Sequence, residues 1–493
     1  MKKDYTLFVM LILFLGLSQV QAQYSQVEKL VSGDRESRAE FGTSVDIIGD
    51  YALVGASRET IAAGAAYVYK RGSDGNWNFA QKLLPFDPKE MAEYGGGAKI
   101  ADGYLVVASG RADIGSVIRA GALYVYKQVN ETWELDTKLV ASDFSGDAKM
   151  GMNPTSLDVE GSTIAVGAPG ETAWTGSVYI FNKNGDTWEE TQKILSPNPQ
   201  VNEVFGIGVS ISGDTLAVGA QGTINNSGAV YIYIKNGSGN WEHNQTLRAS
   251  DIVAEDYFGT SVAIDGNYLV AGSYGKNGET GAAYIFEKDS DGTWTEIQKL
   301  MGHSQEPNKQ FGWSTEIKGN FMMVAAPSVY GSEVGEVYFY KRNSAGEWVE
   351  QQLIQGTDTV AEDVFGWCVA MDGQDAIIGA PWSDLDENGG NSMDSAGAAY
   401  IFGNPTMGIN GQVEKVSLNL YPNPSHGALN IETNGHNIRQ IQLISATATV
   451  FQTIENIESE TFTADLSNYA AGIYFLKITF SNGEQSLKKV IKY

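Results

Sequence analysis

The feature that most constrains this chain is a repeat that recurs seven times between Phe41 and Phe402, with steps of 52 to 59 residues. Six copies open with an aromatic residue followed by glycine, and these pairs start at Phe41, Tyr94, Phe205, Phe258, Phe311 and Phe365. One degenerate copy has Asn153-Pro154 in the place where we expect the pair. Because the copies carry strand patterns and turn residues rather than helical periodicity, the repeat predicts the blades of a β-propeller.

Each copy contains the four strands that a propeller blade requires. The first two are joined by a tight turn such as Gly49-Asp50. The fourth opens with tryptophan in six copies, at Trp77, Trp133, Trp188, Trp241, Trp294 and Trp348. The seventh copy stops after Phe402 without such a strand, whereas Tyr24–Leu30 imitates Ile297–Leu300 near the other end of the chain. We therefore predict that the N-terminal segment completes the last blade and closes the ring.

Composition is consistent with an all-β extracellular protein. The 493 residues are enough for two domains, and 57 glycines suit a chain with many turns. The net charge of −26 argues against a nucleic-acid partner, because phosphate binding needs clustered Lys and Arg. Beyond the N-terminus, no apolar run approaches the length that spans a bilayer, so we expect no transmembrane segment in the mature chain.

The aromatic-glycine pairs and the strands that follow them resemble the FG-GAP repeats of integrin α chains, from about Gln23 to Phe402. The resemblance implies a seven-bladed propeller with an adhesive or binding role. Integrin-type repeats commonly carry an Asp-rich calcium loop between the first two strands of a blade. Here that connection is a two-residue turn such as Gly49-Asp50, so we expect these blade calcium sites to be absent.

The two ends of the chain predict where the protein goes. Lys2 and Lys3 precede an apolar run and a small-residue cleavage site near Ala22, which is typical of a secretory signal peptide over residues 1–22. The propeller is then expected over 23–403 and a linker over 404–415. Residues 416–493 resemble the type A sorting domain of the type IX secretion system of Bacteroidota, through Tyr421-Pro422-Asn423-Pro424, the Ala471-Gly472-Ile473-Tyr474 stretch and a lysine-rich last strand. That resemblance implies a small β-sandwich, contact with the type IX machinery, and secretion or attachment at the outer-membrane surface.

Few residues carry recognisable chemistry. None of the four histidines has metal-ligand spacing, and the single Cys368, in the register of Ser44, is interpreted as a buried, inert thiol. Acids recur just before the anchors, as Glu40, Glu93, Glu203, Asp256 and Asp363. We interpret them as structural groups, although paired acids of glycosidase type at a central channel are the alternative.

One acidic loop has the donor spacing of a calcium site. Asp384, Asp386 and Asn388 alternate oxygen donors, but the distal glutamate and flanking helices of an EF-hand are missing. The competing interpretation is a solvated acidic loop. We expect at most one weakly bound Ca²⁺, and no other cofactor.

The loops between the second and third strands are the variable parts of the repeat, and in a propeller they surround the channel mouth. Their large side chains are the candidate ligand-binding residues: Arg58, Arg111, Trp174, Tyr274, Tyr330 and Trp382. Exposed aromatics with arginines suit contacts with an extracellular protein or glycan. We therefore predict a non-catalytic adhesion propeller. The alternatives are a hydrolase or lyase that acts on polysaccharide through the channel, and a structural element of the cell surface.

Overall fold

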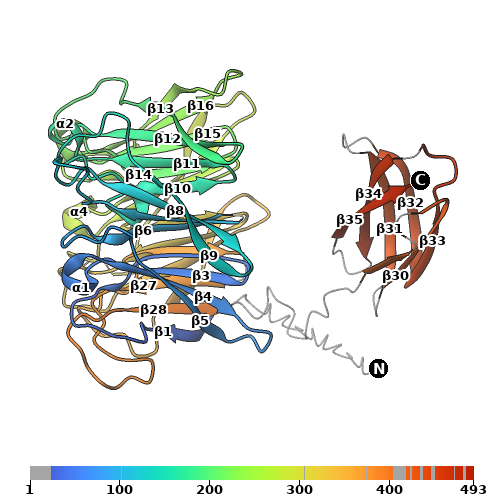
Figure 1. Cartoon of the computed structure of the whole chain (residues 1–493). Helices are drawn as coiled ribbons and strands as arrows, with labels where there is room; N and C mark the ends of the chain where they lie inside the picture. The colour runs from blue at the N-terminus through green and yellow to red at the C-terminus, as the bar shows by residue number, and fades with distance from the viewer. Residues whose placement is uncertain are drawn as a thin grey trace, which may run out of the picture. The chain divides into compact units, whose positions relative to one another are not determined.

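The computed structural model describes residues 24–493 except 102, 305, 374, 404–417, 422, 424, 434–436, 446–449, 471 and 481–484. The chain forms two compact units that divide after Met407, and each is described here by itself (Figure 1). The predicted signal peptide (1–22) and linker (404–415) lie outside the described residues.

The first unit is the predicted all-β propeller of seven four-stranded antiparallel sheets (Figure 1). In blade order, the strands are β2 (Phe41–Ile48), β3 (Tyr51–Ala56), β4 (Ala65–Arg71) and β5 (Trp77–Leu83); β6 (Tyr94–Ala101), β7 (Tyr104–Ser109), β8 (Ala122–Val129) and β9 (Thr132–Leu139); β10 (Leu157–Glu160), β11 (Thr163–Ala168), β12 (Ser177–Asn184) and β13 (Thr187–Ile194); β14 (Phe205–Ser212), β15 (Thr215–Ala220), β16 (Ala229–Lys235) and β17 (Trp241–Leu247); β18 (Phe258–Asp265), β19 (Tyr268–Ser273), β20 (Ala282–Lys288) and β21 (Trp294–Leu300); β22 (Thr315–Lys318), β23 (Phe321–Ala326), β24 (Glu336–Arg342) and β25 (Trp348–Ile354); and β26 (Val369–Asp372), β27 (Asp375–Ala380), β28 (Ala398–Gly403) and β1 (Ser25–Leu30).

The N-terminal strand closes the ring, as predicted. β1 pairs antiparallel with β28 and forms the outer strand of the seventh blade. The Gln352 amide on the sixth blade donates to the Tyr24 carbonyl and accepts from the Tyr24 N–H, both at 2.7 Å. Four other blade interfaces repeat this two-bond contact, from Gln81, Gln192, Gln245 and Gln298 to the tryptophan that opens the next outer strand. Glu28 takes the glutamine position in the closing blade, where it accepts from the Trp77 N–H at 2.8 Å.

The aromatic-glycine anchor has a packing reason. Phe41 is fully buried and makes ring contacts with Tyr67 at 5.3 Å and Tyr69 at 6.3 Å between centroids. Gly42 has φ of +96°, and a Cβ there would lie 2.2 Å from the carbonyl oxygen of Ala398 on the neighbouring blade. Only glycine therefore allows this close approach between β2 and the third strand, β28, of the adjacent blade.

The predicted position of the degenerate anchor, Asn153-Pro154, was wrong. Met150, not Asn153, makes the parallel bridge with Gly121 that Tyr94 makes with Gly64 in the preceding blade. Gly151 has φ of +73°, and its N–H donates to the Gly167 carbonyl at 2.8 Å. The 3-10 helix η1 (Pro154–Ser156) follows as a short insertion before β10. Methionine fills the buried aromatic position, since it is flexible and apolar.

The second unit consists of two small sheets that share one hydrophobic core. One sheet has the order β29 (Leu418–Tyr421), β30 (Ala428–Thr433), β33 (Thr461–Asp465), and the other β32 (Val450–Ser459), β31 (Ile438–Ser445), β34 (Gly472–Phe480), β35 (Gln485–Lys492). Leu429 and Ile431 of the first sheet belong to the same buried cluster as Ile441 and Leu476 of the second. This arrangement agrees with the small β-sandwich that we expected.

In the described part of the chain, none of the helices combines the length and the apolar character that a membrane crossing would need.

Candidate ligand-binding site

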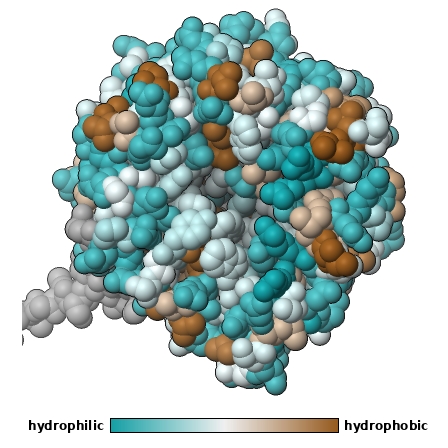
Figure 2. All heavy atoms as spheres, turned by 90° about the vertical axis from the view of Figure 1, so that its left-hand side faces the viewer, coloured by the Kyte–Doolittle hydropathy of each residue, from teal (hydrophilic) through white to brown (hydrophobic). Residues whose placement is uncertain are grey.

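The loops between second and third strands open on one end of the propeller, which we call the mouth face. Four of them contain a short turn whose two central residues have positive φ: α1 (Glu59–Ala62), α2 (Glu171–Trp174), α3 (Thr223–Asn226) and α4 (Lys276–Glu279). These loops lie on the side of the ring that faces the viewer in Figure 2, and the surface there is hollowed at its centre.

Main-chain hydrogen bonds fix these loops to the next blade. The N–H of Tyr257 donates to the Asn226 carbonyl at 2.8 Å, and the N–H of Gln310 donates to the Glu279 carbonyl at 2.8 Å. Tyr257 and Gln310 each precede an anchor and have positive φ values of 53° and 58°. The mouth face therefore presents its side chains on a backbone that is held rigidly by pairing between blades, which suits a preformed binding site.

Five half-buried aromatic residues from three consecutive blades form a continuous arc on this face, which we call the aromatic arc. Tyr257 stacks on Tyr274 with 4.9 Å between ring centroids and 10° between ring planes. Tyr274 contacts Trp313 at 5.2 Å, and Trp313 contacts Trp367 at 5.2 Å. Trp382 ends the arc, 6.5 Å from Trp367. Such rings offer large contact area with little loss of side-chain entropy on binding.

A cavity of about 220 Å³ lies beside the arc, and we call it the arc pocket. Tyr274, Trp313 and Trp367 line one part of it, and Asn153, Pro154, Thr155, Ile207, Gln221 and Thr260 line the rest. The Thr260 hydroxyl donates to Oε1 of Gln221, and the Thr155 hydroxyl donates to the Ile207 carbonyl at 2.9 Å. The pocket thus combines aromatic faces with neutral polar groups.

A second set of side chains on the mouth face is charged and comes from the first two blades. Arg58 Nε lies 3.1 Å from Glu40 Oε1, and its guanidinium also approaches Glu93 at 3.9 Å. Arg111 Nε lies 3.1 Å from the other oxygen of Glu93. Burial raises the pKa of Glu40, and Glu93 adds to that rise while Arg58 opposes it. We call these four residues the Arg–Glu chain.

The six residues predicted to bind ligand divide among several environments. Tyr274 and Trp382 belong to the aromatic arc, whereas Arg58 and Arg111 belong to the Arg–Glu chain. Trp174 lies under the Lys149 ammonium, whose nitrogen is 4.1 Å from the ring centroid. Tyr330 is 77% exposed and lies outside the aromatic arc.

Sequence reasoning missed Tyr257, Trp313 and Trp367 as arc residues. Trp313 and Trp367 follow their anchors directly, at the position where the first two blades have Thr43 and Gly96. That replacement of a small residue by tryptophan in two adjacent copies was the signal that could have found them.

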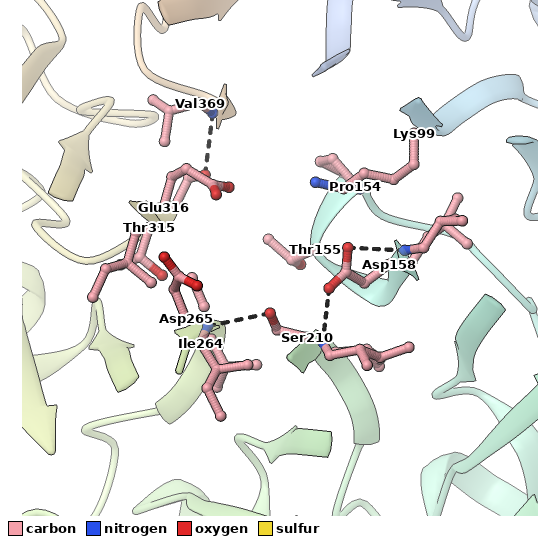
Figure 3. A pocket seen from close by; sticks show the side chains of 18 of the residues that line it. Lys99, Pro154, Thr155, Asp158, Ser210, Ile264, Asp265, Thr315, Glu316 and Val369 are labelled. Carbon is pink, nitrogen blue, oxygen red and sulfur yellow. Dashed lines mark hydrogen bonds between the residues drawn. The ribbon is translucent and has the colours of Figure 1, made fainter. Parts of the chain in front are cut away.

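The central channel carries charged residues from several inner strands. Lys99, Asp158 and Glu316 project into one cavity of about 160 Å³ (Figure 3). Asp158 accepts from the Ile211 N–H at 2.7 Å, and Asp46 accepts from the Ile100 N–H at 2.6 Å, so these carboxylates join neighbouring blades. Burial raises the pKa of Glu316 to about 7, against the opposing effect of Lys99.

The acids before the remaining anchors have the structural contacts that we expected of them. Glu203 accepts hydrogen bonds from the Tyr231 and Ser196 hydroxyls at 2.7 and 2.8 Å. Asp256 accepts from the Val253 N–H at 2.7 Å and from Lys276 Nζ at 2.8 Å. Asp363 accepts from the Val360 N–H at 2.9 Å, and burial raises its pKa to about 6.

Cys368 is buried, and its Sγ lies 3.3 Å from the Gly42 carbonyl. Ser44 is the equivalent residue of the first blade, and its hydroxyl donates to the Gly95 carbonyl at 2.7 Å. Burial raises the pKa of the Cys368 thiol to about 12, so a reactive thiolate is disfavoured.

In the acidic loop, the three predicted calcium ligands already make protein contacts. Asp386 Oδ1 accepts from the N–H groups of Gly390 and Asn388 at 2.8 and 2.9 Å, and these bonds together with one from the Asn391 amide hold the pKa of Asp386 below the usual range. Asp384 Oδ1 accepts from the Ser395 N–H at 2.8 Å, and the Asn388 amide donates to Glu387 at 3.1 Å. Over the described ranges, no group of three or more His, Cys, Asp or Glu side chains is arranged to hold a metal. A weak calcium site here stays a prediction.

Comparison with known proteins follows the same division of the chain. A family model described as FG-GAP repeat matches residues 24–69, 188–233, 241–286 and 348–402. A second model, described as a secretion system C-terminal sorting domain, matches residues 419–493. No curated protein matches this chain. Among solved structures, it is similar to the periplasmic gluconolactonase of Pseudomonas aeruginosa, with 14% identity and a TM-score of 0.44 over 65% of this chain and 86% of that chain.

The sorting domain implies contact with the secretion machinery that reads it, and delivery outside the cell or to the cell surface. The chain is therefore an FG-GAP repeat propeller that is exported by the type IX secretion system through its C-terminal sorting domain.

Proposed function

We propose that the propeller is a non-catalytic binding module, secreted or held at the cell surface, that takes a protein or glycan ligand on its mouth face. The observation that carries this proposal is the aromatic arc. Its rings lie half-exposed on a backbone fixed by bonds between blades, and Trp313 and Trp367 stand where the first, second and fifth blades have Thr43, Gly96 and Thr260. Clustered exposed aromatics of this kind are typical of ligand contacts.

The contacts of the acids favour binding over hydrolysis. A glycosidase needs two carboxyl groups that flank the scissile bond and are available for proton transfer or attack. On the mouth face, Glu40 and Glu93 are paired with the arginines of the Arg–Glu chain. In the channel, Asp46 and Asp158 accept backbone N–H groups of neighbouring blades. These acids are therefore better explained as parts of the scaffold.

The test is a screen of the exported, full-length mature protein on arrays of bacterial, algal and host glycans and of extracellular proteins. The double variant Trp313→Ala/Trp367→Ala removes the centre of the arc. Trp174→Ala is the matched control, because Trp174 is a half-buried tryptophan of the same face outside the arc. We expect a ligand that the control retains and the double variant loses.

The enzyme alternative is checked with the same preparation. Polysaccharides that give array signals are incubated with the protein and sized by chromatography, and we expect their chain length to stay unchanged. Depolymerisation, or array signals that the double variant retains in full, would contradict the proposed function.

A further inference from the structure

We infer that the arc pocket holds one neutral pyranose unit of a glycan, with its ring against the tryptophans. This inference rests on the proposed function and names the ligand class for the same site. Trp313 and Trp367 are 5.2 Å apart with their planes tilted by 47°, so they form an open wall rather than a closed stack. The C–H face of a pyranose is apolar and matches the face of such an indole.

The rest of the pocket provides hydrogen-bonding groups for sugar hydroxyls. The Thr260 hydroxyl donates to Gln221 Oε1, which orients the amide. Among the residues that the structure describes, the Gln221 Nε2 group has no protein acceptor, so both of its hydrogens are left for a ligand. The Thr155 hydroxyl donates to the Ile207 carbonyl, and its oxygen keeps its lone pairs for an incoming hydroxyl. A few convergent polar groups beside apolar faces are typical of small-ligand sites.

Charge narrows the ligand class to neutral sugars. None of the residues that line the arc pocket carries a charge. On the same face, the Glu255 carboxylate accepts from the Tyr257 hydroxyl at 2.6 Å, and the Arg–Glu chain pairs its arginines with its own carboxylates. The chain as a whole has a net charge of −26, which repels polyanions such as uronate or sulfated polysaccharides. A neutral hexose or N-acetylhexosamine unit fits both the lining and the overall charge.

The test is calorimetric titration of the full-length mature protein with neutral oligosaccharides of glucan, mannan, xylan and chitin type. Oligoalginate and oligogalacturonate form the anionic arm. Trp313→Ala removes the stacking wall, Trp313→Phe keeps an aromatic ring, and Gln221→Leu removes the free amide. We expect a neutral oligosaccharide whose Kd rises roughly tenfold or more in Trp313→Ala and in Gln221→Leu. The phenylalanine variant should lose less, and Trp174→Ala should bind as the wild type does.

Several outcomes would overturn the inference. Neutral binding that Trp313→Ala leaves unchanged would show that the sugar binds elsewhere. Anionic oligosaccharides or an arrayed protein could instead bind more tightly than the neutral oligosaccharides, with binding lost in Trp313→Ala. That result would refute the neutral sugar while leaving the proposed function intact. Failure of every neutral oligosaccharide to bind at millimolar concentration would also refute it. If no glycan or protein signal depends on the arc, the proposed function itself fails.

Discussion

At the residue scale, individual polar side chains in the channel join one blade to the next. Asp46, Asp158 and Ser210 each accept an N–H from the inner strand of the following blade. Burial raises the pKa of Asp46, and it also raises the pKa of Glu316 to about 7 from the ordinary 4.5, with Asp46 and Asp158 adding to that rise and Lys99 opposing it. Ionisation of Glu316 is therefore costly near neutral pH.

This gives a prediction for stability against pH. Between pH 4.5 and about 7 the folded chain keeps the Glu316 proton that the unfolded chain has lost, so the free energy of unfolding falls as pH rises through this window. Glu316→Gln should remove that loss and be more stable than wild type at pH 8, by about 1–3 kcal/mol. Chemical denaturation at pH 4.5 and pH 8 measures it, with the exposed Glu134→Gln as control. A destabilised variant at pH 8 would contradict this account of the channel.

At the scale of elements, a single strand supplied from the N-terminus completes the ring. β1 bonds to β28 inside the blade, and Gln352 bonds to both main-chain groups of Tyr24 across the blade interface. The ring therefore closes through the same kind of glutamine-to-main-chain contact that joins other pairs of neighbouring blades.

The closure is tested with two adjacent glutamines. Gln352→Ala should lower the free energy of unfolding by about 1–3 kcal/mol, because it leaves two partly buried main-chain groups of Tyr24 without partners. Gln351→Ala is the matched control, since that amide donates only within its own hairpin, to Val349 at 2.9 Å and to Glu350. Equal melting of the two variants would mean that this contact does not hold the ring closed.

The acidic loop before β28 gives a second prediction at this scale. Calcium would have to compete with the N–H groups that Asp386 and Asp384 already accept, so any binding should be weak, with Kd of about 10⁻⁴ to 10⁻³ M. Titration calorimetry compares the wild type with an Asp384→Ala/Asp386→Ala variant. Three or more tight sites, or binding that survives the double substitution, would contradict the prediction that the short turns between first and second strands bind no calcium.

The sequence predicted the blades well, but it predicted the residues of the candidate site less completely. The anchors, the short turns and the six tryptophan strands each have a local physical cause, so they predicted the ring and its closure. The third anchor was misplaced because Met150-Gly151 keeps the packing without an aromatic residue. Tyr257 and Trp313 lie far apart in sequence and meet only through Tyr274, since blade geometry sets which loops touch.

At the scale of the whole molecule, an FG-GAP repeat propeller is joined to a domain that directs its export. Removal of Val416–Tyr493 should leave a folded propeller that accumulates in the periplasm, because the sorting domain is read at the outer membrane. Cell fractionation with immunoblotting measures this, and a melting transition like that of the full chain shows that the propeller is intact. Normal extracellular levels of the truncated protein would contradict the role of the sorting domain.

The central claim is that the ligand contacts the aromatic arc. The most direct measurement is hydrogen exchange of the full-length mature protein with and without a bound neutral oligosaccharide. The account predicts slowed exchange in the loops that carry Tyr257, Tyr274, Trp313, Trp367 and Trp382. Protection confined to the channel strands around Lys99 and Glu316, or to the acidic loop of Asp384 and Asp386, would contradict it.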